Sequence, residues 1–300
     1  MKLSLLGVPS SAGAQSSGIE KAPAALRRAG LAEALRSTGC EVEDRGDQPE
    51  MPYAPDPDPV HRKYQNLEPV LEVSRILASR VESVLREGRI PLVLGGDCTI
   101  ALGCFAGAAR FRADLGLVYL DRDADLNTPA TTRSGILHGM VLAHLLGRGL
   151  PELSRLGERF PLLRPGRLAL LGADRLDPAE VPIYEALPSY RIHSPEIRSR
   201  GPSRVAVEVL ERVAGGGGAF FVHFDVDAVD GGELPATDFP APGGLALEEA
   251  RLLLSNLVGS PGFAGIDVTE YNPEKDPQAL SAAKVVETMA RILGRGDRKP

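Results

Sequence analysis

The sequence predicts an α/β fold built on a mainly parallel β-sheet. Short apolar runs alternate along the chain with longer segments of helical periodicity. Nearly all of the short runs are continuously apolar, which is typical of parallel strands covered on both faces. A repeated strand, helix, strand order requires crossover connections, and these are right-handed in parallel sheets. We therefore expect a parallel sheet packed between helices.

This pattern locates the individual elements. The predicted strands are Lys2 to Val8, Ile90 to Leu94, Leu115 to Leu120, Arg167 to Leu171, Ala219 to Phe224 and Phe263 to Val268. The predicted helices lie near Pro23 to Arg36, Leu67 to Glu87, Ile100 to Arg110, Leu137 to Leu146, Arg204 to Val213, Leu247 to Leu257 and Gln278 to Leu293.

Length and composition fit one sizeable domain over residues 1–300, with 43% apolar residues to build its core. No run approaches the roughly 18 apolar residues of a membrane span, and the apolar start is too short for a signal peptide. Three cysteines form no even disulfide framework, so we expect a reducing compartment and a cytoplasmic location. The net charge of −6 argues against nucleic acid as a partner and suits a small cationic substrate.

Two clusters of aspartates follow apolar runs and predict a cation site. Residues 121–125 carry three aspartates at alternate positions, and a second cluster lies in residues 225–230. Alternate side chains of an extended strand point the same way, so each cluster is expected to face one side of a strand end. Burying unpaired, ionised carboxylates there would destabilise the fold by on the order of several kcal/mol. Either a cation neutralises them or some hold protons.

Five segments, taken in order, resemble motifs of the ureohydrolase superfamily, the family of arginase, agmatinase and formimidoylglutamase. They are Gly95-Gly96-Asp97-Cys98-Thr99, the stretch from Asp121 to Pro129, Ser134-Gly135-Ile136-Leu137-His138-Gly139-Met140, Asp225-Val226-Asp227 and Glu270-Tyr271-Asn272-Pro273. The opening of the chain also resembles the first strand and helix of the family. The resemblance therefore covers nearly the whole sequence.

This resemblance implies a three-layer α/β/α fold around an eight-stranded, mainly parallel sheet. It also implies two manganese ions that activate a hydroxide for attack on a guanidinium carbon, with release of urea or a related amide. The expected partner is a small guanidino or amidino substrate. Family members are commonly trimers or hexamers, so we expect a homotrimer or a homohexamer.

The resemblance also implies which residues bind the metal. Asp121, Asp125 and Asp225 match carboxylates that bridge the ions or bind the first of them. The resemblance implies that Asp125 is a catalytic residue as well. Asp227 matches a ligand of the second ion.

Two further residues match catalytic positions of the family. His138 matches a proton shuttle near the leaving amine, a role suited to a side chain that titrates near neutrality. Glu270 matches the carboxylate that faces the substrate guanidinium. Outside this context, His138 would be a surface or capping residue and Glu270 a salt-bridge partner at a strand end.

Four residues match the part of the family site that binds an amino-acid substrate. Asn127 and Ser134 match contacts to the α-carboxylate, whereas Asp177 and Glu180 lie in a region that recognises the α-amino group. The segment 177–180 is also an ordinary helix start, with Asp177 as N-cap and proline in the first turn.

The departures from the family concern the metal ligands most. Cys98 and Asp123 stand where the family has histidines, and Ile136 replaces a residue that is often polar. If both bind metal, six negative ligands face two divalent ions and leave a net charge of −2, which raises the pKa of bound water. A shifted pH optimum, a protonated Cys98 or Asp123, a single metal and lost catalysis all remain open. Strand alternation is expected to point Arg122 away from its aspartate neighbours.

The identity of the metal is open for the same reason. A Cys98 thiolate would suit zinc or iron, whereas all-oxygen coordination by the aspartates would suit manganese or magnesium. Cys98 would alternatively be a small apolar residue that packs at a strand-to-helix turn.

Three functional hypotheses follow. The first is a metal-dependent amidinohydrolase that acts on arginine or a modified arginine-like compound. The second is a catalytically silent homologue with a regulatory or assembly role. The third is a metal-dependent hydrolase of a substrate other than a guanidine.

Overall fold

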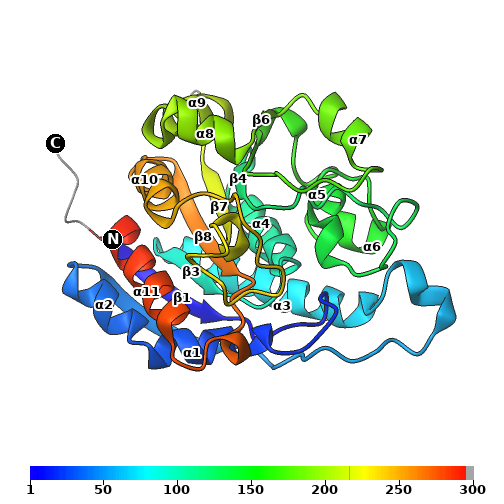
Figure 1. Ribbon diagram of the computed structural model, residues 1–300, viewed down its shortest axis with the longest axis horizontal. Coiled ribbons are helices and arrows are strands. Elements are labelled where there is room, and N and C mark those ends of the chain that lie inside the picture. Colours follow the sequence, from blue (N-terminus) through cyan, green and yellow to red (C-terminus); the bar gives the residue numbers. More distant parts are fainter. Residues whose placement is uncertain (216, 295–300) are drawn as a thin grey trace.

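The structure is a computed structural model that describes residues 1–215 and 217–294. Its strands are β1 (Lys2–Gly7), β2 (Glu41–Asp47), β3 (Ile90–Leu94), β4 (Gly116–Leu120), β5 (Leu168–Leu171), β6 (Tyr190–Ile192), β7 (Phe220–Asp225) and β8 (Phe263–Thr269). They form one eight-stranded parallel sheet in the order β2-β1-β3-β8-β7-β4-β5-β6 (Figure 1). The predicted parallel α/β class is confirmed, as is the eight-stranded sheet implied by the family resemblance.

Helices cover both faces of the sheet and complete three layers (Figure 1). They are α1 (Ala22–Arg28), α2 (Leu31–Ser37), α3 (Leu67–Arg86), α4 (Ile100–Phe111), α5 (Val141–Leu145), α6 (Pro151–Ser154), α7 (Val181–Ala186), α8 (Ser194–Arg200), α9 (Pro202–Val213), α10 (Leu247–Val258) and α11 (Leu280–Leu293). Because strand side chains alternate, Phe220, Val222 and Phe224 of β7 enter the core beneath α9 and α10. Phe221 enters the opposite core with α3 and α4. Two apolar cores therefore flank the sheet.

The six predicted strands are all present, and the two that the sequence pattern missed lie at the sheet edges. β2 has the polar sequence Glu-Val-Glu-Asp-Arg-Gly-Asp and is mostly exposed, and β6 has three residues. The helix predicted from Pro23 to Arg36 is in fact two helices, because Gly30 between them adopts a left-handed φ of 85°. The helix predicted from Leu137 to Leu146 begins instead as a 3-10 turn, His138–Met140, which α5 continues. The pattern also missed α6, α7 and α8, which are too short to show helical periodicity.

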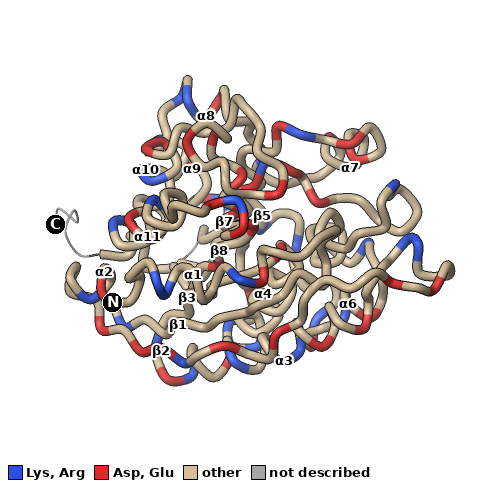
Figure 2. Tube along the Cα trace, turned by 60° about the horizontal axis from the view of Figure 1, so that its bottom comes forward, with Lys and Arg blue, Asp and Glu red and all other residues tan. Residues whose placement is uncertain are grey.

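The topology places the candidate site in the middle of the sheet. β3, β8, β7 and β4 are adjacent, so the loops after their carboxyl ends lie side by side. Among the described residues, no helix is long and apolar enough to cross a membrane. In the view of Figure 2, basic and acidic residues are interspersed over the outer helices and loops.

Candidate metal and catalytic site

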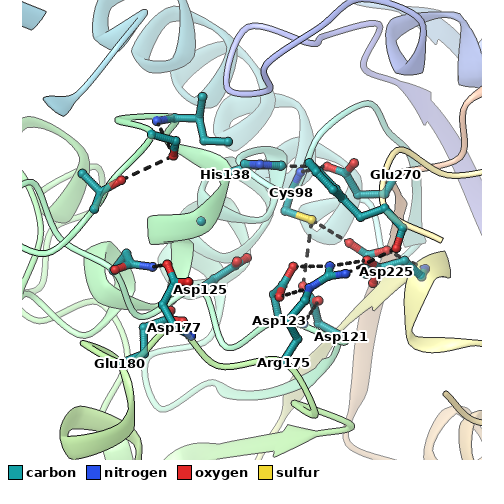
Figure 3. Close-up of a pocket in the computed structure, with 17 residues that line it drawn as sticks. Cys98, Asp121, Asp123, Asp125, His138, Arg175, Asp177, Glu180, Asp225 and Glu270 are labelled. Atoms are coloured by element: carbon teal, nitrogen blue, oxygen red, sulfur yellow. Dashed lines mark hydrogen bonds and ion pairs between the residues drawn. The ribbon is translucent and has the colours of Figure 1, made fainter. Parts of the chain in front are cut away.

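One pocket of about 310 Å³ collects every residue that the sequence assigned to the site (Figure 3). These residues are Cys98, Asp121, Asp123, Asp125, Asn127, Ser134, His138, Asp177, Glu180, Asp225, Asp227 and Glu270. The pocket lies where the loops after β3, β4, β5, β7 and β8 meet. Its size suits a small molecule.

The first aspartate cluster reaches the pocket through a loop, and not by strand alternation as predicted. β4 ends at Leu120, and Asp123 then forms an isolated parallel bridge with Arg175 in the loop after β5. Asp125 has a left-handed φ of 49°, and its carboxylate accepts a 2.5 Å hydrogen bond from the Tyr119 hydroxyl. The loop conformation, stabilised by these contacts, aims the carboxylates at one pocket.

The second cluster follows β7 directly. Asp225 is the last residue of the strand, and Asp227 lies in the 3-10 turn Val226–Ala228. The Asp227 amide donates to Asp225 Oδ1 at 2.7 Å, which fixes the turn and leaves Asp225 Oδ2 directed at the pocket. Asp230 instead accepts from the amides of Gly232 and Gly243 and does not line the pocket.

Cys98 lies at the base of the pocket, at the turn between β3 and α4. Its thiol donates to Asp225 Oδ2 at 2.9 Å, and Asp121 Oδ2 lies 4.0 Å from the sulfur. Burial, together with the negative charge of Asp225, raises the pKa of the Cys98 thiol well above its ordinary value. The residue is therefore a thiol in the cation-free protein, and a bound metal would displace its proton.

His223 belongs to this group, although the sequence interpretation missed it. Cys98, Asp121, His223 and Asp225 place four potential ligand atoms within 4.8 Å of one another. The buried His223 ring stacks on Tyr119, with ring centroids 4.1 Å apart, and its Nδ1 lies 2.6 Å from Asp267 Oδ1. A detectable signal was present, because His223 and Asp225 occupy alternate positions of β7 and so face the same side.

Arg175 was also missed, and it lies among the aspartates expected to bind the second ion. Its Nε and Nη2 atoms donate to both oxygens of Asp123 at 2.6 and 2.5 Å, and Nη2 also donates to Asp227 Oδ2 at 3.0 Å. These ion pairs raise the pKa of the Arg175 guanidinium despite its burial. Arg122 points away from the aspartates, as predicted, and donates to the carbonyl of Pro242 at 2.5 Å.

His138 and Glu270 form a pair on another wall of the pocket (Figure 3). His138 Nδ1 lies 3.3 Å from Glu270 Oε1, which also accepts from the Cys98 amide at 3.2 Å. Glu270 Oε2 is buried and has no hydrogen-bond partner among the described residues. Burial lowers the pKa of His138, but the hydrogen bond and charge of Glu270 outweigh it and raise the pKa to about 9.

The four predicted substrate contacts separate into two kinds. Asn127 Nδ2 donates to Asp177 Oδ2 at 3.0 Å, and Ser134 lies exposed in the pocket lining. Both oxygens of the buried Glu180 are instead occupied by the amides of Leu126 and Asp177, at 2.8 Å each. Glu180 thus holds together the two loops that form this end of the pocket. Asp177 is not a helix N-cap, because α7 begins only at Val181.

The electrostatics of the pocket favour cations. Burial and the charge of Asp121 raise the pKa of Asp125 well above its ordinary value, and burial and Asp227 do the same for Asp225. The pKa of Asp227 rises to about 8, mainly through burial and Asp121, although Arg175 opposes the shift. Burial lowers the pKa of His223, but the charges of Asp267 and Asp121 raise it to about 9. The cluster therefore holds protons when no cation neutralises it.

The comparison with known proteins identifies the family. A family model described as the arginase family matches residues 1–293. The chain belongs to the arginase family. It is similar to the arginase of Brevibacillus brevis, at 32% identity over 292 residues and 97% of each chain. It is also similar to arginase-1 of Homo sapiens, at 32% identity over 97% of this chain and 91% of that protein.

Solved structures agree with this membership. The native structure of Bacillus caldovelox arginase matches with a TM-score of 0.93 and 31% identity over 99% of each chain. Arginase-family proteins are hydrolases of carbon–nitrogen bonds, and they normally bind divalent metals. Family membership and the shared fold therefore support a metal-dependent hydrolase in general terms.

The donor atoms of this chain fit one divalent cation better than the two ions that the family resemblance implies. Among the described residues, one group of donors is clustered tightly enough for a metal, and it consists of Cys98, Asp121, His223 and Asp225. The buried Nε2 of His223 has no hydrogen-bond partner among the described residues and lies 3.7 Å from Asp121 Oδ2, so it can become a ligand once a metal displaces its proton. Asp123 and Asp227, by contrast, already neutralise the Arg175 guanidinium.

Proposed function

We propose that this chain is a metal-dependent hydrolase that cleaves a carbon–nitrogen bond of a small linear guanidino or amidino compound. The observation that supports this function most is the His138–Glu270 pair beside the carboxylate cluster. Neither residue holds the sheet together, and both line the pocket. Their arrangement combines a proton donor with an acceptor for a cationic substrate.

Glu270 is the proposed receptor for the substrate guanidinium or amidinium. The Cys98 amide fixes Glu270 Oε1, while Oε2 is buried without a partner. A buried carboxylate oxygen without a donor is costly, and a charge-assisted hydrogen bond from a substrate N–H would remove that cost. The left-handed φ of 63° at Glu270 is a further sign of a functional constraint.

His138 is the proposed proton donor to the leaving amine. With a pKa of about 9 the imidazole is protonated at neutral pH, the form that a general acid requires. The ring is held by Glu270 and packs near Phe239, with ring centroids 5.8 Å apart. A divalent cation bound beside it would supply the nucleophile by lowering the pKa of water.

The outer end of the pocket supports arginine or a modified arginine-like compound as the substrate. Asp177 is exposed there, with one oxygen held by Asn127, and its charge suits an α-amino group. Asn127 and Ser134 offer polar groups to a carboxylate. Ile136 lines the same pocket and provides no hydrogen bond from its side chain, so an unmodified α-carboxylate would have fewer contacts.

One observation favours a catalytically silent homologue as the second candidate. The Arg175 guanidinium lies within the carboxylate cluster and neutralises part of its charge. If that pair prevents any cation from binding, the fold would retain a substrate-shaped pocket without a nucleophile. The metal content and the turnover of the protein therefore separate the two candidates.

The test is release of urea from arginine, agmatine or guanidinobutyrate, or of hydroxyurea from hydroxyarginine, by the metal-loaded protein. We expect at least one of them to be hydrolysed. His138→Asn should then lower kcat by about 10²- to 10⁴-fold, the usual contribution of a general acid. Glu270→Gln should lower kcat/KM with a raised KM, because it weakens the contact with the cationic group.

The matched control is His193→Asn, which changes a histidine outside the pocket with a 40% exposed side chain. It should retain the activity of the unmodified protein. If a metal-loaded protein releases neither urea nor hydroxyurea from any of the four compounds, the amidinohydrolase proposal is wrong. Activity that survives unchanged in His138→Asn would instead overturn the role given to His138.

A further inference from the structure

We propose that this chain binds a single thiophilic divalent metal ion at Cys98, Asp121, His223 and Asp225, and that the Arg175 guanidinium replaces a second ion at Asp123 and Asp227. The proposed function depends on such a cation, but metal binding can be measured without turnover. In this site His223 is a metal ligand and Arg175 is a fixed cation. Neither residue was assigned to the site from the sequence.

The four donors converge from separate elements of the sheet. Cys98 follows β3, Asp121 follows β4, and His223 and Asp225 lie on β7. Their ligand atoms all lie within 4.8 Å of one another, and all four residues are buried. A site assembled from neighbouring strands of the sheet and their ends is rigid. Its donors are therefore held in place for a metal better than the carboxylates of a flexible acidic surface would be.

His223 has the surroundings of a metal-binding histidine. Its Nδ1 lies 2.6 Å from Asp267 Oδ1, so the carboxylate orients the ring and directs Nε2 toward Asp121 and Cys98. Metal-bound histidines usually donate their other N–H to such a carboxylate. Nε2 itself is fully buried and has no hydrogen-bond partner among the described residues. A buried polar atom without a partner is costly, and a metal ion would satisfy it.

The surrounding strands keep this ring in position. Tyr119 of β4, His223 of β7 and Asp267 of β8 are direct neighbours in register across three adjacent strands. Tyr119 stacks on the imidazole at an interplanar angle of 20°. The tyrosine hydroxyl in turn donates to Asp125. The rotation of the His223 ring is therefore restricted from both sides.

The donor set selects the type of metal. One sulfur, one imidazole nitrogen and two carboxylates are all ligand types that zinc binds, and they also suit iron(II) or cobalt(II). Manganese prefers all-oxygen surroundings more than this set offers. When a metal binds, the Cys98 thiol, the His223 Nε2–H group and the protonated carboxyl groups of the cluster lose their protons to solvent. The thiolate, the neutral imidazole and the carboxylates then bind the ion. The sulfur–metal bond replaces the hydrogen bond to Asp225.

Arg175 accounts for the other two aspartates. Its planar fork makes a bidentate contact with Asp123 and a third hydrogen bond with the buried Asp227. The Arg175 guanidinium also lies over the Phe239 ring, 5.5 Å from its centroid, which helps to hold it there. Its single charge offsets one of these two carboxylates. The guanidinium thus occupies the donors that a second divalent ion would need.

The experiment measures metal bound to the metal-free protein after equilibrium dialysis against zinc or manganese. The unmodified chain should bind one equivalent of zinc. His223→Asn should weaken zinc binding by about 100-fold or more, because losing even the partner behind a ligand typically costs 10- to 100-fold. Arg175→Gln should raise the manganese capacity by one equivalent, because it frees Asp123 and Asp227. The matched control is His144→Gln, a change at another fully buried histidine, and it should bind zinc like the unmodified chain.

The cobalt(II) form supplies a readout that does not depend on the folding of the histidine variant. Unmodified protein should show a thiolate-to-cobalt charge-transfer band, and Cys98→Ser should lack it.

Two equivalents of zinc in the unmodified chain, or no zinc, would overturn the single site. Unchanged zinc affinity in His223→Asn, or a cobalt form without the thiolate band, would also overturn the proposed site. Unchanged manganese capacity in Arg175→Gln would overturn the role of Arg175. Stoichiometric zinc without release of urea or hydroxyurea would refute the proposed function and leave this inference standing.

Discussion

His138 and His144 show how strongly the surroundings of one side-chain type determine its chemistry. Next to Glu270, the pKa of His138 rises to about 9 despite burial. Burial lowers the pKa of His144 to about 4, because the ring has one polar contact among the described residues, the Met140 carbonyl 2.7 Å from Nδ1. His144 Nε2 has no partner among the described residues. A proton there would create a buried charge without a counter-charge, so His144 stays neutral.

The state of His144 predicts how stability depends on pH. The folded pKa lies below the unfolded value of 6.5, so the contribution is fully present above pH 6.5 and is lost as the pH falls toward 4. Between pH 7.5 and pH 5 the loss should be about 2 kcal/mol. Urea unfolding of metal-free protein at both pH values would measure it. His144→Gln should lose about 2 kcal/mol less over this interval, and an identical pH dependence in both proteins would contradict the explanation.

At the scale of elements, the packing of α4 on α3 determines how Cys98 is held. Gly103 and Gly107 lie one turn apart on α4 and face α3. A Cβ atom at Gly107 would lie 2.3 Å from the Ala78 carbonyl oxygen, and one at Gly103 would lie 2.7 Å from that of Ser74. The two helices therefore approach with backbone against backbone. Because α4 begins two residues after Cys98, this contact helps to position the pocket floor.

The close approach of these helices predicts that Gly107→Ala destabilises the protein. Alanine favours an isolated helix by about 1 kcal/mol over glycine, but the clash must move α4 away from α3. We expect a net loss of about 1–3 kcal/mol in urea unfolding. Gly166→Ala is the control, because its Cβ would meet nothing within 4 Å, and it should change stability by less than about 0.5 kcal/mol. A Gly107→Ala protein as stable as the control would show that the helices separate without cost.

At the scale of the whole molecule, the site joins segments that are far apart in the sequence. The four proposed metal donors span residues 98–225 and depend on three central strands of the sheet. Those donors come together only in the folded chain, so metal binding is coupled to folding. The homotrimer or homohexamer implied by the family resemblance stays a prediction.

This coupling predicts that zinc stabilises the fold. Free zinc at 100 times its dissociation constant should raise the free energy of unfolding by about 2.7 kcal/mol, and a chelator should remove the gain. Urea unfolding with and without zinc measures the difference. The gain should fall below about 0.5 kcal/mol in His223→Asn at the same zinc concentration. Zinc-independent stability in the unmodified chain would contradict a site formed by folding.

The sequence predicted the fold better at its centre than at its edges. Mainly apolar runs identify β3, β4, β7 and β8, because strands buried on both faces are near-continuously apolar. His223 and Asp267 are buried polar exceptions on β7 and β8. The edge strand β2 is mostly exposed and carries charged residues, so no apolar pattern distinguishes it from a loop. A single residue, Gly30, divided one predicted helix into two.

The sequence by itself determined the fold class, the family resemblance and most of the residues that line the pocket, because these depend on local patterning and on ordered motifs. It also contained the signal for His223, since alternate positions of a strand share one face. Only the tertiary structure decided which charges meet. Arg175 reaches Asp123 because β5 lies next to β4, and His223 reaches Asp267 because β8 lies next to β7. These pairings depend on strand order and register, so contacts between distant segments, and not local sequence, decide what the pocket can bind.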